Sequence, residues 1–84
     1  MNNRVFWDPH AESQLEQILS NEALQTRILA AARAIDGQLL TAPLNFGESR
    51  FDTFRIAFER PLGVLFEVQG DVRTVIVYEV WLIE

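Results

Sequence analysis

The chain has 84 residues, of which 49% are hydrophobic and 23% are charged. This length leaves room for one domain with a modest core, and this composition excludes a wholly disordered chain. Seven arginines stand against twelve carboxylates, for a net charge of −5, and neither half of the chain is basic. Because nucleic-acid binding depends on cations that neutralise phosphates, the few arginines would have to gather on one surface to bind RNA or DNA. We expect one domain over residues 1–84.

Two residue types are missing, and each absence excludes a kind of chemistry. Without cysteine there is neither a disulfide nor a thiolate metal site, and without lysine there is no lysine base or Schiff-base amine. The guanidinium is then the only strong cation, suited to forked recognition of anions but a poor base. No apolar run approaches the roughly 18 residues that a membrane span needs, and no signal peptide is visible. We expect a soluble, cytoplasmic protein that does not contact membranes.

The first half of the chain predicts a short strand followed by two helices. Val5–Trp7 is β-branched and aromatic, and it stops at Asp8–Pro9, where Asp suits a helix cap and Pro the first helical position. Helical periodicity then predicts one helix over about Pro9–Leu19 and a second one capped by Asn21. The apolar stripe of the second helix comprises Leu24, Ile28, Ala31, Ala32, Ile35 and Leu39.

The second half predicts three strands in a row. Thr41–Pro43 ends the second helix, and Leu44–Arg50 is expected to be the only long irregular connection. The strands are Phe51–Glu59, Val64–Val68 and Thr74–Leu82.

Alternation within these strands indicates which residues share a face. In the first of them Phe54, Ile56 and Phe58 alternate with more polar residues, so we expect their side to be buried and the side of Arg55 to be partly wet. The last strand is apolar on both sides. Strict alternation puts Val75, Val77 and Trp81 on one face, and Ile76, Tyr78, Val80 and Leu82 on the other.

The resulting order is β-α-α-β-β-β, an α+β fold in two layers. A helical hairpin packs on one face of a mostly antiparallel four-stranded sheet and leaves the second face open. The first strand fits either edge of the three-stranded meander.

Candidates for catalysis are few. His10 is the sole histidine and lies in the first turn of a helix, where a solvated side chain is the usual outcome. A metal site would need a second histidine, a cysteine or carboxylates at ligand spacing, and none is present. Gly47–Arg50 has one glycine and no lysine, so it is not a phosphate-binding P-loop. We expect no metal and no cofactor.

Four arginines fall in the meander or just before it: Arg50, Arg55, Arg60 and Arg73. If Arg50 and Arg55 point to the open sheet face, they form a small cationic patch that suits phosphate or a carboxylate-rich partner. The competing interpretation, which we favour, is that carboxylates of the same strands neutralise these arginines across the sheet. Those carboxylates are Glu48, Asp52, Glu59, Glu67 and Glu79.

Several short motifs together resemble the RelE/ParE superfamily of bacterial toxins, and the resemblance covers nearly the whole chain. The motifs are Trp7-Asp8-Pro9 followed by Ala11 and Leu15, Ile35-Asp36 with Leu39 before Pro43, Gly47-Glu48-Ser49-Arg50, Leu62 to Val68, and the valine-rich last strand. The resemblance implies the toxin of a type II toxin–antitoxin pair, of the kind that stabilises plasmids. A small antitoxin would neutralise it with an extended or helical tail. RelE-like members cut messenger RNA on the ribosome, whereas ParE-like members poison DNA gyrase.

The chain departs from the ribonuclease branch of this superfamily. That branch carries several basic residues on the sheet, and a Tyr or His near the C-terminus. Arg55 falls where the first basic residue is expected, but Gly63-Val64 stands near the expected position of another arginine. Trp81 to Glu84 replaces a basic segment, and Tyr78 lies within the last strand rather than beyond it. An acidic chain also approaches the polyanionic ribosome against repulsion.

We therefore interpret the chain as a toxin that acts mainly by protein–protein contact, either ParE-like or catalytically degenerate. The expected partner-binding residues are Arg50, Arg55, Arg73, Tyr78 and Trp81, with Leu65 or Phe66 in the apolar floor. One alternative is a ribosome-dependent mRNA endonuclease, in which the same three arginines hold phosphate. Another is a non-toxic homodimeric module that associates through Trp7 and Trp81.

Overall fold

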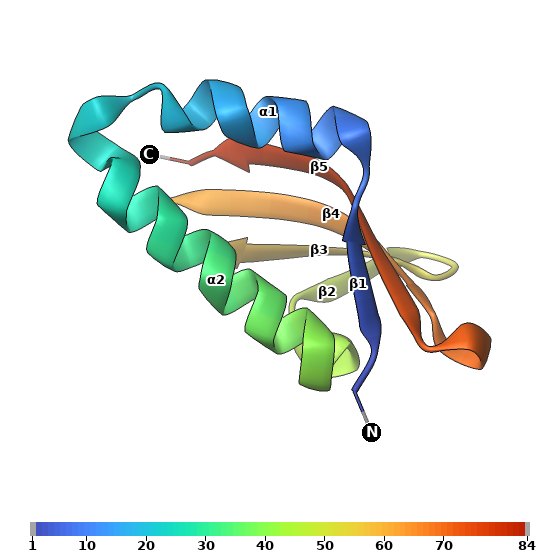
Figure 1. Cartoon of the computed structure of the whole chain (residues 1–84). Coiled ribbons are helices and arrows are strands. Elements are labelled where there is room, and N and C mark those ends of the chain that lie inside the picture. The colour runs from blue at the N-terminus through green and yellow to red at the C-terminus, as the bar shows by residue number, and fades with distance from the viewer. Residues whose placement is uncertain (1, 84) are drawn as a thin grey trace.

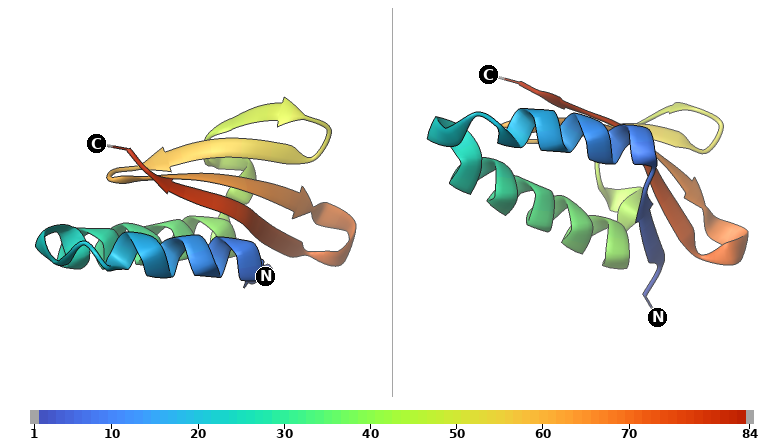
Figure 2. Two further views of the ribbon diagram at one scale, coloured as in Figure 1. Left: turned by 90° about the horizontal axis from the view of Figure 1, so that it is seen from above. Right: turned by 45° about the horizontal axis from the view of Figure 1, so that its top comes forward.

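Two helices pack on one face of a five-stranded sheet in the computed structural model, which describes residues 2–83. Figure 1 shows both helices over the strands, and the left view of Figure 2 separates the helical layer from the sheet. The elements are β1 (Arg4–Trp7), α1 (Pro9–Leu19), α2 (Gln25–Thr41), β2 (Glu48–Phe51), β3 (Phe54–Glu59), β4 (Leu62–Gln69) and β5 (Thr74–Leu82). The predicted α+β class is confirmed. No helix in this part of the chain is long and apolar enough to cross a membrane.

The strand order is β1-β5-β4-β3-β2. The pairing of β1 with β5 is parallel, whereas the pairings β5–β4, β4–β3 and β3–β2 are antiparallel. The first strand therefore lies beside the last one (Figure 1), which resolves the edge that the sequence left open. The predicted count of four strands is wrong, because β2 adds a fifth.

Strand β2 lies where an irregular connection was expected. Glu48–Phe51 pairs with β3, and the predicted strand Phe51–Glu59 is divided by a turn in which Asp52 has a φ of 47°. All four side chains of β2 are exposed. An edge strand with no buried side has no alternation of apolar and polar residues, so its sequence carries no strand signal.

The helix starts differ in how well the sequence predicts them. Asp8 caps α1 as expected, since one of its carboxylate oxygens accepts a hydrogen bond of 3.0 Å from the amide of His10. The side chain of Asn21 makes no such bond, and a 3₁₀ turn over Glu22–Leu24 precedes α2, which begins only at Gln25. The predicted cap at Asn21 is therefore wrong.

The core lies between α2 and the sheet. The predicted stripe of α2 is confirmed at Ile28, Ile35 and Leu39, all of which are fully buried. They pack in one cluster with side chains of β4 and β5: Leu62, Val64, Phe66, Val75, Val77 and Val80. Burying each of the larger side chains contributes about 1.5–3 kcal/mol to folding. Helix α1 closes the layer through Ala11, which is also fully buried.

A β-bulge in β5 changes which of its residues share a face. Leu65 pairs with Glu79 but Phe66 pairs with Val77, so Tyr78 is an extra residue that faces no partner in β4. Beyond the bulge Val80 turns toward the helices and is buried, and Trp81 faces away from them. Strict alternation therefore assigns Val80 and Trp81 to the wrong faces. The bulge places Tyr78 and Trp81 on one surface.

Candidate functional site

The sheet face that the helices leave uncovered carries a row of aromatic and aliphatic side chains. We call it the aromatic face, and it comprises Phe51, Phe54, Ile56, Phe58, Leu65, Tyr78 and Trp81. Phe51 is 60% exposed and Phe58 is 58% exposed. The expectation for β3 is thus wrong, because its apolar residues lie on the open side and Ala57 faces the core. Leu65 lies in the expected floor, but Phe66 is buried under the helices.

The rings form two groups along this face. Phe54 stacks on Phe51 with ring centroids 4.9 Å apart and contacts Tyr78 at 5.6 Å. Trp81 meets Phe58 edge-on at 6.4 Å. All three centroid distances lie in the range of favourable aromatic pairs.

Gly63 makes room for the indole of Trp81. A Cβ at position 63 would lie 2.6 Å from Trp81 Nε1, well inside contact distance. The missing side chain at Gly63 lets Trp81 lie on β4 and adds apolar surface to the open face.

Glu67 occupies the middle of the first ring group and is held by three donors. Its Oε1 accepts hydrogen bonds of 3.0 Å from both the Tyr78 hydroxyl and the Gln69 amide, and its Oε2 accepts one of 2.9 Å from Thr53. The bond from Thr53 is the main reason that the pKa of Glu67 lies below its ordinary value, while burial opposes the shift. Burial, and then the bond to Glu67, raises the pKa of Tyr78. The site therefore holds an ionised carboxylate beside a neutral phenol.

Replacing Thr53 by valine should raise the pKa of Glu67, because it removes the donor that contributes most to the ionised form. A carboxyl with a depressed folded-state pKa stabilises the fold above its unfolded-state pKa, and this contribution is lost as the pH falls through the folded value. The T53V variant should lose less stability between about pH 5 and pH 3 than the parent chain does. NMR titration of the Glu67 side chain measures the shift, and an unchanged pKa would contradict this account of the carboxylate.

Arg55 is not on the open face. It is paired with the buried Phe66, so its side chain points to the helical side of the sheet. There its Nε donates to the carbonyl of Phe46 at 3.2 Å and a terminal nitrogen donates to the carbonyl of Gly47 at 2.9 Å. The expected cationic patch of Arg50 and Arg55 does not form, because Arg55 lies on the other side of the sheet and its side chain donates hydrogen bonds to the loop before β2.

The other two predicted arginines lie at different places, Arg50 at the β2 edge and Arg73 in the turn between β4 and β5. Arg50 lines a hollow of about 440 Å³ at the β2 edge, together with Glu48, Ile56 and Phe58. Arg73 is exposed in the turn between β4 and β5, in a left-handed conformation with a φ of 50°. The fold thus places Tyr78 and Trp81 on one face, in separate ring groups, and keeps the three arginines apart.

The structure also places His10 and Trp7, which the sequence analysis considered for catalysis and for dimerisation. His10 is exposed in the first turn of α1. Within residues 2–83 no three His, Asp or Glu side chains gather closely enough to hold a metal ion. Trp7 is partly buried against the core on the helical side, where its Nε1 donates a hydrogen bond of 2.8 Å to Asp36. Trp7 and Trp81 therefore lie on opposite faces of the sheet.

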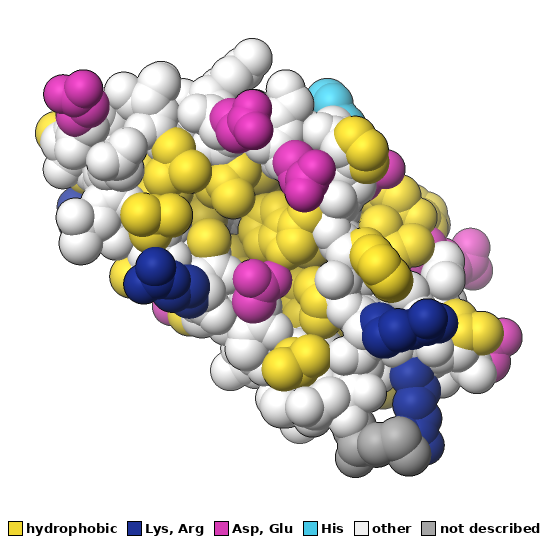
Figure 3. All heavy atoms as spheres, viewed as in Figure 1, with side chains coloured by type: hydrophobic (Ala, Val, Ile, Leu, Met, Phe, Trp, Pro, Cys, Tyr) yellow, Lys and Arg dark blue, Asp and Glu magenta, His cyan; other side chains and the backbone are white. Residues whose placement is uncertain are grey.

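A second apolar surface lies between the two helices. Figure 3 shows hydrophobic side chains in the hollow between α1 and α2, with acidic side chains at its rim. The hollow measures about 380 Å³ and is lined by Trp7, Leu15, Leu19, Ala32, Glu12, Glu16 and Asp36. It is physically separate from the aromatic face, because the sheet stands between them.

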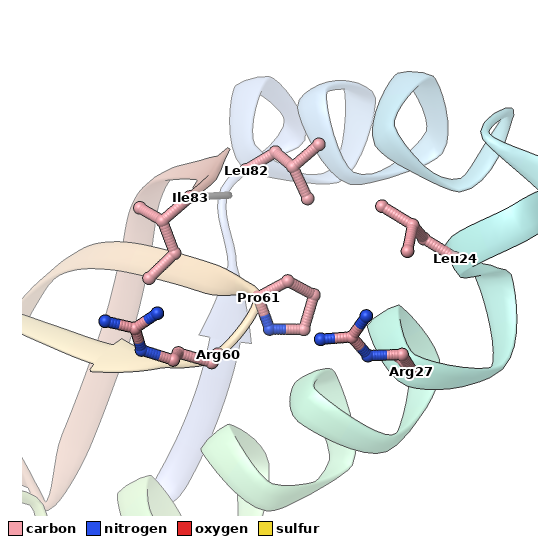
Figure 4. A pocket seen from close by; sticks show the side chains of 6 residues that line it. All are labelled: Leu24, Arg27, Arg60, Pro61, Leu82 and Ile83. Carbon is pink, nitrogen blue, oxygen red and sulfur yellow. The ribbon is translucent and has the colours of Figure 1, made fainter.

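The arginines Arg27 and Arg60 line a smaller pocket that the sequence did not predict. Figure 4 shows both side chains beside Pro61, with Leu24, Leu82 and Ile83 completing a pocket of about 90 Å³. Arg27 comes from the start of α2 and Arg60 from the turn between β3 and β4. Since this juxtaposition depends on how the helices sit over the sheet, no local sequence signal marks it.

Comparison with solved structures identifies the fold. No family model matches the chain, and no curated protein matches it. A chain of the toxin–antitoxin complex RelBE2 from Mycobacterium tuberculosis superposes with a TM-score of 0.79 at 22% identity, covering 98% of this chain and 99% of that one. A chain of the chromosomal ParDE toxin–antitoxin system from P. aeruginosa gives a TM-score of 0.65 at 21% identity, covering 98% and 97%. The chain has the fold of RelE/ParE-type toxins, as the resemblance in its sequence implies.

Proposed function

We propose that this chain is the toxin component of a type II toxin–antitoxin module and that it acts mainly by protein–protein contact. The observation that carries the proposal is the aromatic face, on which the bulge in β5 unites Tyr78 and Trp81. Exposed aromatic side chains are enriched at the energetically dominant positions of protein interfaces. The fold supports the assignment as a toxin, because the two solved structures described above are of toxin–antitoxin systems.

The charges of the aromatic face favour protein over RNA as the target. Glu67 lies among its rings, and Arg55 is engaged with two backbone carbonyls on the other side of the sheet. Cleaving RNA requires groups that stabilise negative charge on the reacting phosphate, and a carboxylate among the rings of the face opposes this. We therefore propose that the chain is a ParE-like or catalytically degenerate toxin and not a ribosome-dependent endonuclease. The cytoplasmic partners would be a small antitoxin-like protein and a protein target such as DNA gyrase.

Expression in a bacterial host tests the proposal. Induction should arrest growth. Co-expression of the antitoxin, which we expect a short reading frame next to this gene to encode, should relieve the arrest. Cellular messages should remain intact, since no RNA is cut. The R50A and R73A variants should still arrest growth, whereas the endonuclease alternative predicts that they lose activity and that the parent chain leaves cleaved messages. No arrest, or arrest with cleaved messages, would contradict the proposal.

A further inference from the structure

The aromatic face carries more carboxylates than arginines. Besides Glu67, it has Glu79 at the bulge, paired with Leu65, and Glu48 on β2, paired with Ile56. Its arginines lie at the two edges of the sheet: Arg50 at the β2 edge and Arg4 at the β1 edge, where Arg4 is paired with Thr74. A partner that covers the face must therefore bring positive charge to avoid burying unpaired carboxylates.

The first ring group offers a defined place for one cation. Glu67 lies opposite Phe54 in the sheet register and accepts a bond from Tyr78, so carboxylate and rings adjoin. Oε1 of Glu67 accepts two hydrogen bonds but Oε2 accepts only one, from Thr53. Since an ionised carboxylate offers about four acceptor positions, Oε2 retains the capacity for a further donor. A ring face together with a free carboxylate position is the combination that a guanidinium contacts by stacking and charge-assisted hydrogen bonding.

The second ring group lies further along the same face. The indole of Trp81 lies on Gly63, which is four residues from Glu67 in β4. In an extended strand this separation is roughly 13 Å. A partner helix spans about 12 Å over eight residues. The partner residue that contacts Glu67 and the partner residue that contacts Trp81 would therefore lie about two turns apart if the partner is helical. They would lie four residues apart if the partner is extended.

We propose that the aromatic face binds a cationic, amphipathic segment of a partner protein through an arginine that donates to Oε2 of Glu67 and lies beside the rings of Phe54 and Tyr78. An apolar residue of the same segment packs on Trp81 and Phe58. This inference deepens the proposed function, on which it rests for the existence of a protein partner, by giving the chemistry of that partner. It also reverses the sequence-based expectation, in which arginines of this chain bind an acidic partner.

A titration with a single amino acid tests the cation site without knowledge of the partner. The probe is N-acetyl-arginine methylamide, and its neutral counterpart is N-acetyl-citrulline methylamide, which has nearly the same shape. NMR signals of the Gln69 side-chain amide, Thr53 and Tyr78 should shift with the arginine probe. The arginine probe should bind at least about fivefold more tightly than the citrulline probe, because only it carries the charge.

Two matched variants locate the effect. E67Q removes the charge of Glu67 with little change in shape and should abolish the preference for arginine. E12Q makes the same change at an exposed carboxylate of α1, in the hollow between the helices, and should keep the preference. Equal binding of the two probes, a preference that survives E67Q, or shifts confined to the helical side would each overturn the inference.

The outcome is separable from that of the growth assay. Growth arrest that a neighbouring gene product relieves, together with equal binding of the two probes, rejects the arginine site and leaves the proposed function standing. A clear preference for arginine without any growth arrest supports the site as a property of the fold and counts against the toxin assignment.

Discussion

Replacing Gly47 by alanine should lower the free energy of unfolding by about 3 kcal/mol or more. Gly47 has a φ of +74°, a conformation that costs an L-residue roughly 1–2 kcal/mol. The new Cβ would also lie 2.6 Å from the Cβ of Ala57 and even closer to the carbonyl oxygen of Ile56. These atoms belong to β3, so they yield only if the sheet edge moves. Urea denaturation of the purified variant measures the loss.

Gly37 provides the matched control. It lies within α2, and nothing is within 4 Å of the position that its Cβ would take. Alanine there should stabilise the chain by about 0.5–1 kcal/mol, because it is the better helix former. Similar stability changes for G47A and G37A would show that the loop before β2 is not held as described. The carbonyls of Phe46 and Gly47, which accept hydrogen bonds from Arg55, are part of that loop.

The second large effect is expected on binding rather than on folding. Replacing Trp81 by alanine should weaken binding of a protein partner by about 2–4 kcal/mol, which corresponds to about 30- to 1,000-fold. Trp81 is a large aromatic side chain of the aromatic face, where it packs edge-on with Phe58, and truncating such a side chain within an interface is costly. Isothermal titration calorimetry with the neighbouring gene product measures the change. A melting curve of the free variant must show that it remains folded.

Leu29 serves as the control for this variant. It is 39% exposed on α2, in the layer opposite the aromatic face. The L29A variant should bind within about twofold of the parent chain, since scattered exposed aliphatic residues outside an interface contribute little. Loss of affinity in L29A with full affinity in W81A would move the interface to the helices.

The sequence predicts the elements with periodic burial and misses those without it. Helix α2 is predicted because each turn buries a residue such as Ile28, Ile35 or Leu39. Strand β2 is missed because an exposed edge strand needs no apolar residue. It is a strand because it forms hydrogen bonds with β3, and these depend on the turn at Asp52 that brings β3 alongside it.

The candidate site depends on features that a linear pattern does not contain. The bulge at Tyr78 shifts β5 by one residue, and a strand with apolar residues on both sides gives no clear alternation from which such a shift could be predicted. The side on which Arg55 lies follows from its pairing with Phe66, which sequence alone leaves undefined. Gly63 gives no signal of its role in the sequence, and only its pairing with Trp81 shows that it accommodates the indole.

The two tryptophans lie on opposite faces of the sheet, so one NMR measurement distinguishes which face a protein partner binds. The indole N–H signals of Trp7 and Trp81 are followed while the unlabelled neighbouring gene product is added to the labelled chain. If the partner binds the aromatic face, the Trp81 signal should shift strongly and the Trp7 signal, bonded to Asp36 on the helical side, should stay in place. A shift of Trp7 with no change at Trp81 would show that the partner binds the helical side and not the aromatic face.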